Sequence, residues 1–141
     1  MVRDAIFNAP QLKASDIEFH LPKPNYTIST LTHLQEKHPQ DEFCLLLGED
    51  NLRSFHKWYN WEQILAKHRI YVYPRQREEG AEQAPHTALE QHPNIEMVKD
   101  VPILGISASF VRKRLASGKD CSFLLTEPVA KYIADRGLYQ K

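Results

Sequence analysis

Five consecutive apolar residues at positions 43–47 constrain the fold more than any other stretch of this 141-residue chain. The run has the length of a strand, and polar residues bound it on both sides. An unbroken apolar run of this length is typical of a strand buried on both faces of a parallel sheet. Gly48, Glu49 and Asp50 follow at once, where such a strand should end. A second strand is predicted over 68–73. Its apolar run, 70–73, is predicted to be the neighbour of the first run and also buried on both faces.

Helix-like and strand-like patterns alternate along the rest of the chain. This alternation predicts βαβ units in an α/β fold with a parallel central sheet, in one domain over 1–141. The polar stretch 76–94 is predicted to be a mobile surface excursion, and the proline-rich stretch 21–24 a loop. Further strands are predicted over 14–20 and 95–98, and helical segments over 1–8, 28–38, 52–59, 58–65, from Ser107 onward, and 129–135.

Residues 105–119 combine hydroxyl groups, a helix start and a basic side chain. Ser107 can cap the helix, whose free N–H groups lie at the positive end of the helix dipole. Arg112 follows Ser109 by three residues, about one turn, so both can face one ligand. Hydroxyl, amide and guanidinium groups together suit a phosphate. The same residues also fit a capped surface helix with a basic face that ends at Gly118, and the spacing leaves both interpretations open.

Other polar or aromatic residues stand where ligands bind in parallel sheets, beyond the carboxyl ends of strands. Gly48 permits close backbone approach, and Asp50 offers a carboxylate to a ribose hydroxyl or a metal. On these residues alone, a turn with a solvated acid is the favoured interpretation. Trp58 and Tyr59 could stack on an aromatic ligand or belong to the core. Arg75 could pair with a phosphate or face solvent.

Composition narrows the class of protein. Eighteen basic residues balance eighteen acidic ones, so neither a nucleic acid nor a membrane is expected as partner. The start of the chain is too polar for a signal peptide, and Cys44 and Cys121 form no Cys-x-x-Cys pair, which predicts reduced thiols and a cytoplasmic location. The seven histidines show no metal-ligand spacing.

In this order, the clusters resemble the nicotinate mononucleotide adenylyltransferase family, which has a Rossmann-like nucleotidyltransferase fold. The Ile-Ser-x-Ser-x-x-Arg element is shared with related adenylyltransferases, whereas Tyr-Thr, Gly-x-Asp and Trp-Tyr together are more specific to nicotinate mononucleotide. The resemblance covers nearly the whole chain. Its matching stretches are 25–31, 47–52, 55–59, 64–65, 72–75, 106–112, 129–133 and 137–139.

The resemblance implies a role for each candidate residue on the mononucleotide side. Trp58 would stack on the pyridine ring, while the backbone amides of Thr27 and Tyr59 would hold its carboxylate. Gly48 and Asp50 would line the ribose site.

On the ATP side, the resemblance implies that Ser107, Ser109 and Arg112 hold the phosphates and the adenosine, and that Arg75 adds positive charge. The reaction would be adenylyl transfer from ATP to nicotinate mononucleotide, giving deamido-NAD and pyrophosphate. Mg²⁺ is expected to accompany ATP, with no protein ligand assigned. A homo-oligomer, and a preference for nicotinate over nicotinamide, stay open.

The chain departs from the family pattern in three places. It contains no His-x-Gly-His element, and its first residues resemble the end of an uncapped helix. Roughly 50 residues, about one βα unit with its crossover, are therefore expected to be missing from the amino terminus, and activity to be weak or absent. Ser109 replaces the usual Thr, and Pro74-Arg75-Gln76 replaces Arg-Pro-Gly. The alternatives are a non-catalytic nucleotide-binding or oligomerising remnant, and a sister adenylyltransferase for another phosphate substrate.

Overall fold

The structure is a computed structural model that describes residues 1–75, 88–103 and 105–139. The chain forms two compact units. The sheet unit spans Ile17–Leu104, and the helical unit combines Met1–Asp16 with Gly105–Lys141. The prediction of one domain over 1–141 stays a prediction.

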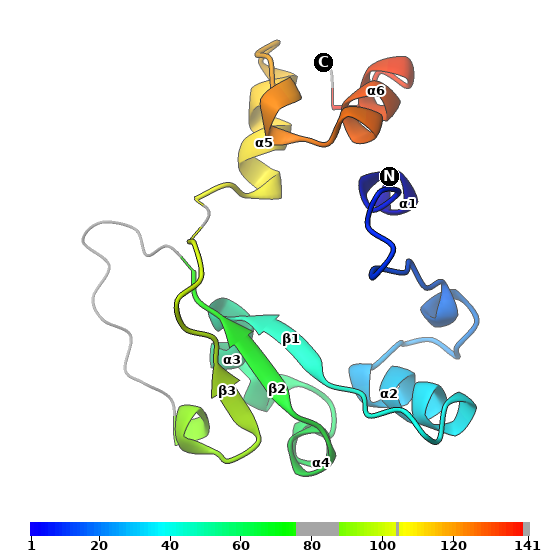
Figure 1. Ribbon diagram of the computed structural model, residues 1–141, viewed down its shortest axis with the longest axis vertical. Helices are drawn as coiled ribbons and strands as arrows, with labels where there is room; N and C mark the ends of the chain where they lie inside the picture. The colour runs from blue at the N-terminus through cyan, green and yellow to red at the C-terminus, as the bar shows by residue number, and fades with distance from the viewer. Residues whose placement is uncertain (76–87, 104, 140–141) are drawn as a thin grey trace. The chain divides into compact units, whose positions relative to one another are not determined.

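A three-stranded parallel sheet with strand order β1-β2-β3 forms the centre of the sheet unit (Figure 1). Leu45 pairs with Ile70 and Leu47 with Val72, which confirms that the two apolar runs are parallel neighbours. Ile70 in turn pairs with Ile95. The strands are β1 (Leu45–Gly48), β2 (Ile70–Tyr73) and β3 (Ile95–Met97).

β1 begins two residues later than the apolar run predicts. The ladder starts where the N–H of Leu45 donates to the carbonyl of Arg69 at 2.9 Å. Phe43 lies outside the ladder, because its carbonyl oxygen accepts a hydrogen bond from His68 Nδ1 at 2.8 Å.

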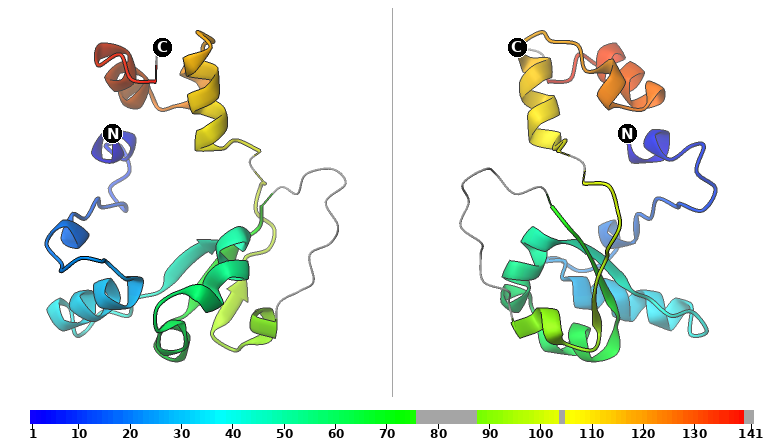
Figure 2. Two further views of the ribbon diagram at one scale, coloured as in Figure 1. Left: turned by 180° about the vertical axis from the view of Figure 1, so that it is seen from behind. Right: turned by 60° about the vertical axis from the view of Figure 1, so that its left-hand side comes forward.

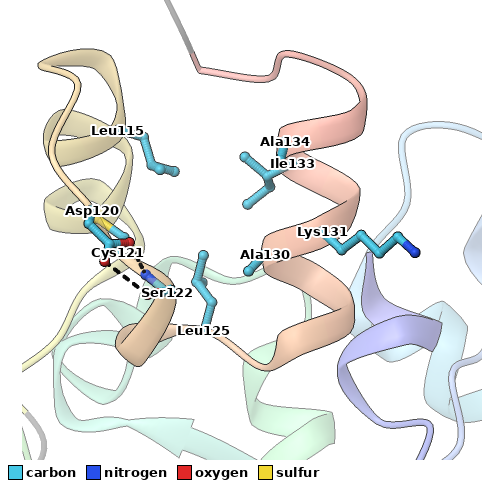
Figure 3. Close-up of a pocket in the computed structure, with 9 residues that line it drawn as sticks. All are labelled: Leu115, Asp120, Cys121, Ser122, Leu125, Ala130, Lys131, Ile133 and Ala134. Carbon is cyan, nitrogen blue, oxygen red and sulfur yellow. Dashed lines mark hydrogen bonds between the residues drawn. The ribbon is translucent and has the colours of Figure 1, made fainter.

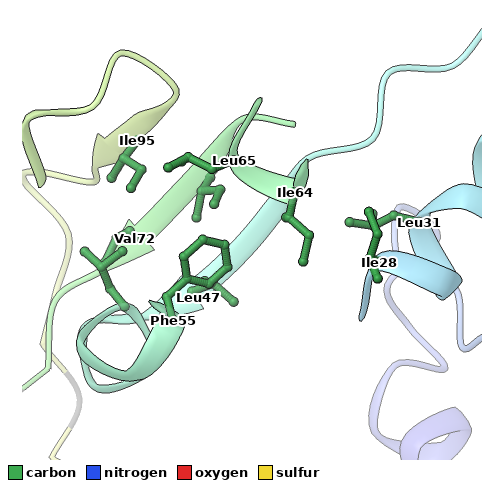
Figure 4. Packing of buried hydrophobic residues seen from close by; sticks show 10 residues of the cluster. Ile28, Leu31, Leu47, Phe55, Ile64, Leu65, Val72 and Ile95 are labelled. Carbon is green, nitrogen blue, oxygen red and sulfur yellow. The ribbon is translucent and has the colours of Figure 1, made fainter. Parts of the chain in front are cut away.

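The prediction that β1 is buried on both faces is wrong. Leu47 is 8% exposed, whereas Leu46 is 71% exposed. Successive side chains of a strand point to opposite faces of the sheet. In Figure 4, Phe55 lies beside Leu47 and Val72, so the described core covers the face that carries these residues. The burial of Leu46 would need a second covering layer, which the described residues do not provide.

Short helices connect the strands and supply most of the core. α3 (Glu49–Ser54) contacts both β1 and β2, and Figure 2 shows it against one face of the sheet. Phe55 is 0% exposed and lies 5.3 Å from Trp58 and 6.1 Å from Trp61 between ring centroids. The other connecting helices are α2 (Thr27–Lys37), η2 (Phe55–Lys57) and α4 (Trp61–Lys67), and the core cluster comprises Ile28, Leu31, Leu47, Leu52, Phe55, Ile64, Leu65, Ile70, Val72 and Ile95.

The predicted strand over 14–20 is wrong, because a 3₁₀ turn, η1 (Ile17–Phe19), stands there instead. The N–H of His20 closes this turn on the carbonyl of Ile17 at 3.0 Å. The carboxylate of Glu18 accepts a hydrogen bond from Thr30 at 2.9 Å, so the turn is fixed against α2 through a side chain rather than a ladder.

Only part of the predicted excursion over 76–94 can be compared with the structure, since 76–87 lie outside the described residues. The remaining part contains a 3₁₀ turn, η3 (Ala88–Gln91). The N–H of His92 closes that turn on the carbonyl of Leu89 at 3.0 Å, just before β3.

The helical unit contains the predicted helices near Ser107 and over 129–135. Gly118 (φ 70°) and Gly137 (φ 58°) adopt left-handed backbone after these helices, a conformation that glycine reaches without strain. The predicted helix over 1–8 is shorter, since it ends at Ala5. The elements are α1 (Val2–Ala5), α5 (Ala108–Ala116), η4 (Ser122–Leu124) and α6 (Glu127–Asp135).

Candidate functional site

Gly48, Asp50 and Arg75 meet beyond the carboxyl ends of β1 and β2. Arg75 Nε lies 3.4 Å from Asp50 Oδ1. A Cβ atom on Gly48 would lie 2.4 Å from that oxygen and 3.0 Å from Arg75 Nε. Only a residue without a side chain therefore leaves the ion pair undisturbed. The group presents a cation and an anion to solvent, since both side chains are more than half exposed.

Glu49, between Gly48 and Asp50, is a member of this group that sequence reasoning missed. It is 8% exposed, and its Oε1 lies 3.0 Å from Arg53 Nη2. Its Oε2 accepts a hydrogen bond from the backbone N–H of Arg75 at 3.5 Å. The sequence does contain a signal for this contact. Arg53 follows Glu49 by four positions, the spacing that allows an ion pair on one face of a helix.

Two tyrosines bring the segments that carry Thr27 and Trp58 together. The rings of Tyr26 and Tyr59 lie 4.4 Å apart between centroids with an angle of 30° between their planes. Thr27 is the first residue of α2, in the turn whose N–H groups have no intrahelical partner. Trp58 is half-buried and packs against the core. The order of the clusters in the sequence also leads us to expect Trp58 near Gly48, and this proximity stays a prediction.

In the helical unit, Ser107, Ser109 and Arg112 lie at the N-cap and in the first two turns of α5. Ser107 is the N-cap, and its Oγ accepts a hydrogen bond from the N–H of Phe110 at 3.1 Å. Arg112 Nη2 donates to Ser109 Oγ at 3.1 Å. All three residues are exposed, so the guanidinium and hydroxyl groups are accessible to an anion. The remaining predicted site residues belong to the sheet unit.

Replacement of Ser107 by Ala should lower the free energy of unfolding by about 1 kcal/mol, because the cap of α5 is lost. Ser107→Asp should retain most of the stability, since a carboxylate also caps. Urea unfolding followed by circular dichroism measures both, with Ser109→Ala as the control that leaves the cap intact. Equal losses for Ser107→Ala and Ser107→Asp would refute the capping role.

Two apolar pockets are lined by none of the predicted site residues. In the helical unit, a cavity of about 350 Å³ lies between α5, η4 and α6 (Figure 3). At its edge the backbone N–H and the hydroxyl of Ser122 donate to Asp120 at 2.8 and 3.0 Å, which lowers the pKa of Asp120. In the sheet unit, a groove of about 280 Å³ is lined by Ile28, Leu31, Thr32, Gln35, Glu36, Lys67 and His68.

The described residues contain no group of three or more His, Cys, Asp or Glu side chains that could hold a metal ion. Cys44 is exposed and Cys121 buried, and both are free thiols. Within the same residues, every helix is too short or too polar to cross a membrane.

The model of the cytidylyltransferase-like family matches residues 1–114 of the chain. The chain is 45% identical to a protein of Flavobacterium johnsoniae named "Probable nicotinate-nucleotide adenylyltransferase", over 100% of the chain and 70% of that protein. It is 46% identical to a protein of the same name from Christiangramia forsetii, over 99% of the chain and 70% of the relative.

A solved structure has the same fold. The nicotinic acid mononucleotide adenylyltransferase of Plasmodium falciparum, complexed with APC, superposes with a TM-score of 0.74 at 22% identity, over 99% of this chain and 72% of that one. This agreement confirms the α/β fold that the alternating pattern predicts and the nucleotidyltransferase type that the resemblance implies. The family match and the two relatives confirm the resemblance noted in the sequence: the chain belongs to the cytidylyltransferase-like family and, among its members, to the nicotinate-nucleotide adenylyltransferases.

Proposed function

We propose that this protein transfers the adenylyl group of ATP to nicotinate mononucleotide, giving deamido-NAD and pyrophosphate in NAD biosynthesis. The observation that carries the proposal is the family membership, at 45% identity over the full chain. The cluster of Gly48, Asp50 and Arg75 and the exposed basic start of α5 provide groups suited to the two substrates.

On the mononucleotide side, Trp58 presents an aromatic surface for the pyridine ring. The stacked rings of Tyr26 and Tyr59 hold the start of α2 close to the segment before α4. The amide of Thr27, in the first turn of α2, then serves as a donor to the nicotinate carboxylate, and the positive end of the helix dipole favours that anion. The amide of Tyr59 is the second proposed donor.

On the ATP side, Ser107, Ser109 and Arg112 hold phosphate oxygens. The hydrogen bond from Arg112 to Ser109 orients the guanidinium before ATP binds. Arg75 contributes a second cation, and the Arg75–Asp50 ion pair is exposed enough to exchange partners.

In the reaction, an oxygen of the mononucleotide phosphate forms a bond to the α-phosphorus of ATP. The bond from that phosphorus to the oxygen bridging the α- and β-phosphates breaks, and pyrophosphate leaves with the bonding electron pair. The protein forms no covalent intermediate in this scheme. Its side chains position the two phosphates and stabilise the negative charge that develops on them.

Mg²⁺ binds nucleotides largely through their phosphates, with one or two protein carboxylates at most. The exposed carboxylate of Asp50 is paired with Arg75, and the described residues supply no cluster of metal ligands. These residues do not form a magnesium site of their own, so no step of the mechanism is assigned to the metal.

Replacement of Trp58 by Ala should raise KM for nicotinate mononucleotide by about 10-fold or more, because the aromatic stacking surface is lost, while KM for ATP should change little. Initial rates of pyrophosphate release measure both constants. They are best measured with the extended protein, which is this chain preceded by a segment that carries the family's His-x-Gly-His element.

Two conservative variants serve as controls for this prediction. Trp58→Phe keeps an aromatic face and should retain most of the affinity. Trp61→Phe alters the other tryptophan that packs on Phe55 and should leave both Michaelis constants near the wild-type values. Equal increases for the two substrates in Trp58→Ala would contradict the assignment of Trp58 to the pyridine ring.

A further inference from the structure

Glu49 is buried in a way that is unusual for an acidic residue. Glutamate is almost never fully buried unless it is paired, because a desolvated carboxylate is costly. Its side chain is 10% exposed, whereas that of Asp50, the next residue, is 61% exposed. The two neighbouring acids therefore have different environments: Asp50 faces solvent, and Glu49 faces the protein.

The carboxylate of Glu49 links two elements of the sheet unit. One oxygen pairs with Arg53 on the next turn of α3 at 3.0 Å. The other accepts a hydrogen bond from the backbone N–H of Arg75, beyond the carboxyl end of β2, at 3.5 Å. Glu49 thus joins the helix that follows β1 to the residue that carries the proposed phosphate-binding cation.

Arg75 has a second contact in this group, but a weak one. Its guanidinium pairs with Asp50 at 3.4 Å between side chains that are 55% and 61% exposed. An exposed pair of this kind contributes about 0–1 kcal/mol and holds its side chains loosely. The contact of Glu49 with the Arg75 backbone is also long, at 3.5 Å, but its carboxylate is buried and held by Arg53. It is therefore better shielded from water than the Asp50 pair and better suited to fixing the position from which the guanidinium extends.

We propose that Glu49 is a positioning residue of the transfer reaction, which holds the backbone of Arg75 so that its guanidinium meets the phosphates of ATP. This inference rests on the proposed function. Stability alone is a weak reason for a buried carboxylate, since replacing a buried ion pair by apolar residues of similar volume is often neutral or stabilising. Glu49 acts through Arg75 and touches no reacting atom.

A double-mutant cycle tests the proposal in the extended protein. Glu49→Ala should lower kcat/KM for ATP by about 10- to 100-fold, the scale expected when a positioning contact is lost. Glu49→Gln should recover most of that loss, because its amide oxygen can accept the Arg75 hydrogen bond. Glu49→Ala combined with Arg75→Ala should be no slower than Arg75→Ala, since residues that act as one unit are not additive. Glu62→Ala, at an exposed position on α4, is the matched control.

A second measurement, on the 141-residue chain, does not depend on turnover. The Nε–H signal of Arg75 in ¹⁵N NMR spectra should move toward that of a solvated arginine in Glu49→Ala and stay near the wild-type position in Glu49→Gln. Should Glu49→Ala fail to fold, the double cycle is carried out with Glu49→Met, which fills a similar volume but accepts no strong hydrogen bond. Arg53→Ala, which removes the partner of Glu49, is expected to shift the same signal by a smaller amount.

The outcomes separate this inference from the proposed function. Additive losses in the double mutant, or an Arg75 signal that Glu49→Ala leaves unchanged, would overturn the positioning role. Arg75→Ala with unchanged kcat/KM for ATP would instead remove Arg75 from the proposed site, and the positioning role with it. Absence of pyrophosphate release in the extended wild-type protein would overturn the proposed function itself.

Discussion

A protein that consists of these 141 residues alone should release pyrophosphate from ATP and nicotinate mononucleotide at least about 10³-fold more slowly than the extended protein. Loss of one group that stabilises charge in a transition state costs about 10²–10³ in rate, and groups that act together are not fully additive. The sequence contains no His-x-Gly-His element. Ser107, Ser109 and Arg112 are proposed to hold phosphate, but the histidines that the resemblance places on the transferring phosphate are not among the 141 residues.

The measurement uses pyrophosphate release by protein whose intact mass confirms the 141-residue chain. The extended protein with both histidines of the added segment changed to Ala is the control, and it should be about as slow as the chain alone. Turnover by the 141 residues within tenfold of an ordinary enzyme rate, about 10 per second, would refute the need for those histidines.

Replacement of Phe55 by Ala should destabilise the sheet unit by about 3–5 kcal/mol, the cost of removing a phenylalanine from a packed core. Phe55 is 0% exposed and touches both Trp58 and Trp61. A loss of this size is a large fraction of the total stability of a domain, which is about 5–15 kcal/mol. Since Trp58 packs on Phe55, the variant should also weaken binding of nicotinate mononucleotide before the unit unfolds.

Urea unfolding followed by tryptophan fluorescence measures the effect, because both tryptophans of the chain lie beside Phe55. Phe123→Ala is the control: its ring is 98% exposed, so the midpoint should hardly move. Similar midpoints for the two variants would show that Phe55 does not anchor the core. Phe55→Leu, which refills much of the volume, should recover a good part of the loss.

β1 and β2 could be predicted because both are short, continuous apolar runs, without the spacing of three or four residues that an amphipathic helix shows. The run before Gly48 and the run before Pro74 both became strands, in the predicted parallel pairing. The stretch around Ile17 was mistaken for a strand because two apolar residues with one polar residue between them also fit a turn. The exposure of Leu46 was missed because a single sequence does not show what covers each face of a sheet.

The candidate site was partly predictable because parallel sheets place ligand-binding residues beyond the carboxyl ends of strands. That rule singles out Gly48, Asp50 and Arg75, which the structure brings together. The same rule does not distinguish Glu49 from Asp50. Which of these adjacent acids is buried depends on how α3, the helix that follows the strand, packs on the sheet. The roles of these residues stay predictions.

The regular pairing of the sheet has a consequence for how the protein folds as it is synthesised. Leu45 pairs with Ile70, and Ile70 pairs with Ile95. β2 and β3 therefore each pair with a strand that lies the same number of residues earlier in the chain. These three strands can therefore pair in the order in which the ribosome releases them, with none of the three inserted between the other two. Pairings of moderate sequence separation also keep the loop-closure cost of each step small. Until β2 emerges, however, the apolar residues of β1 lack the described strand that pairs with them, and such unpaired apolar strands favour aggregation of a nascent chain.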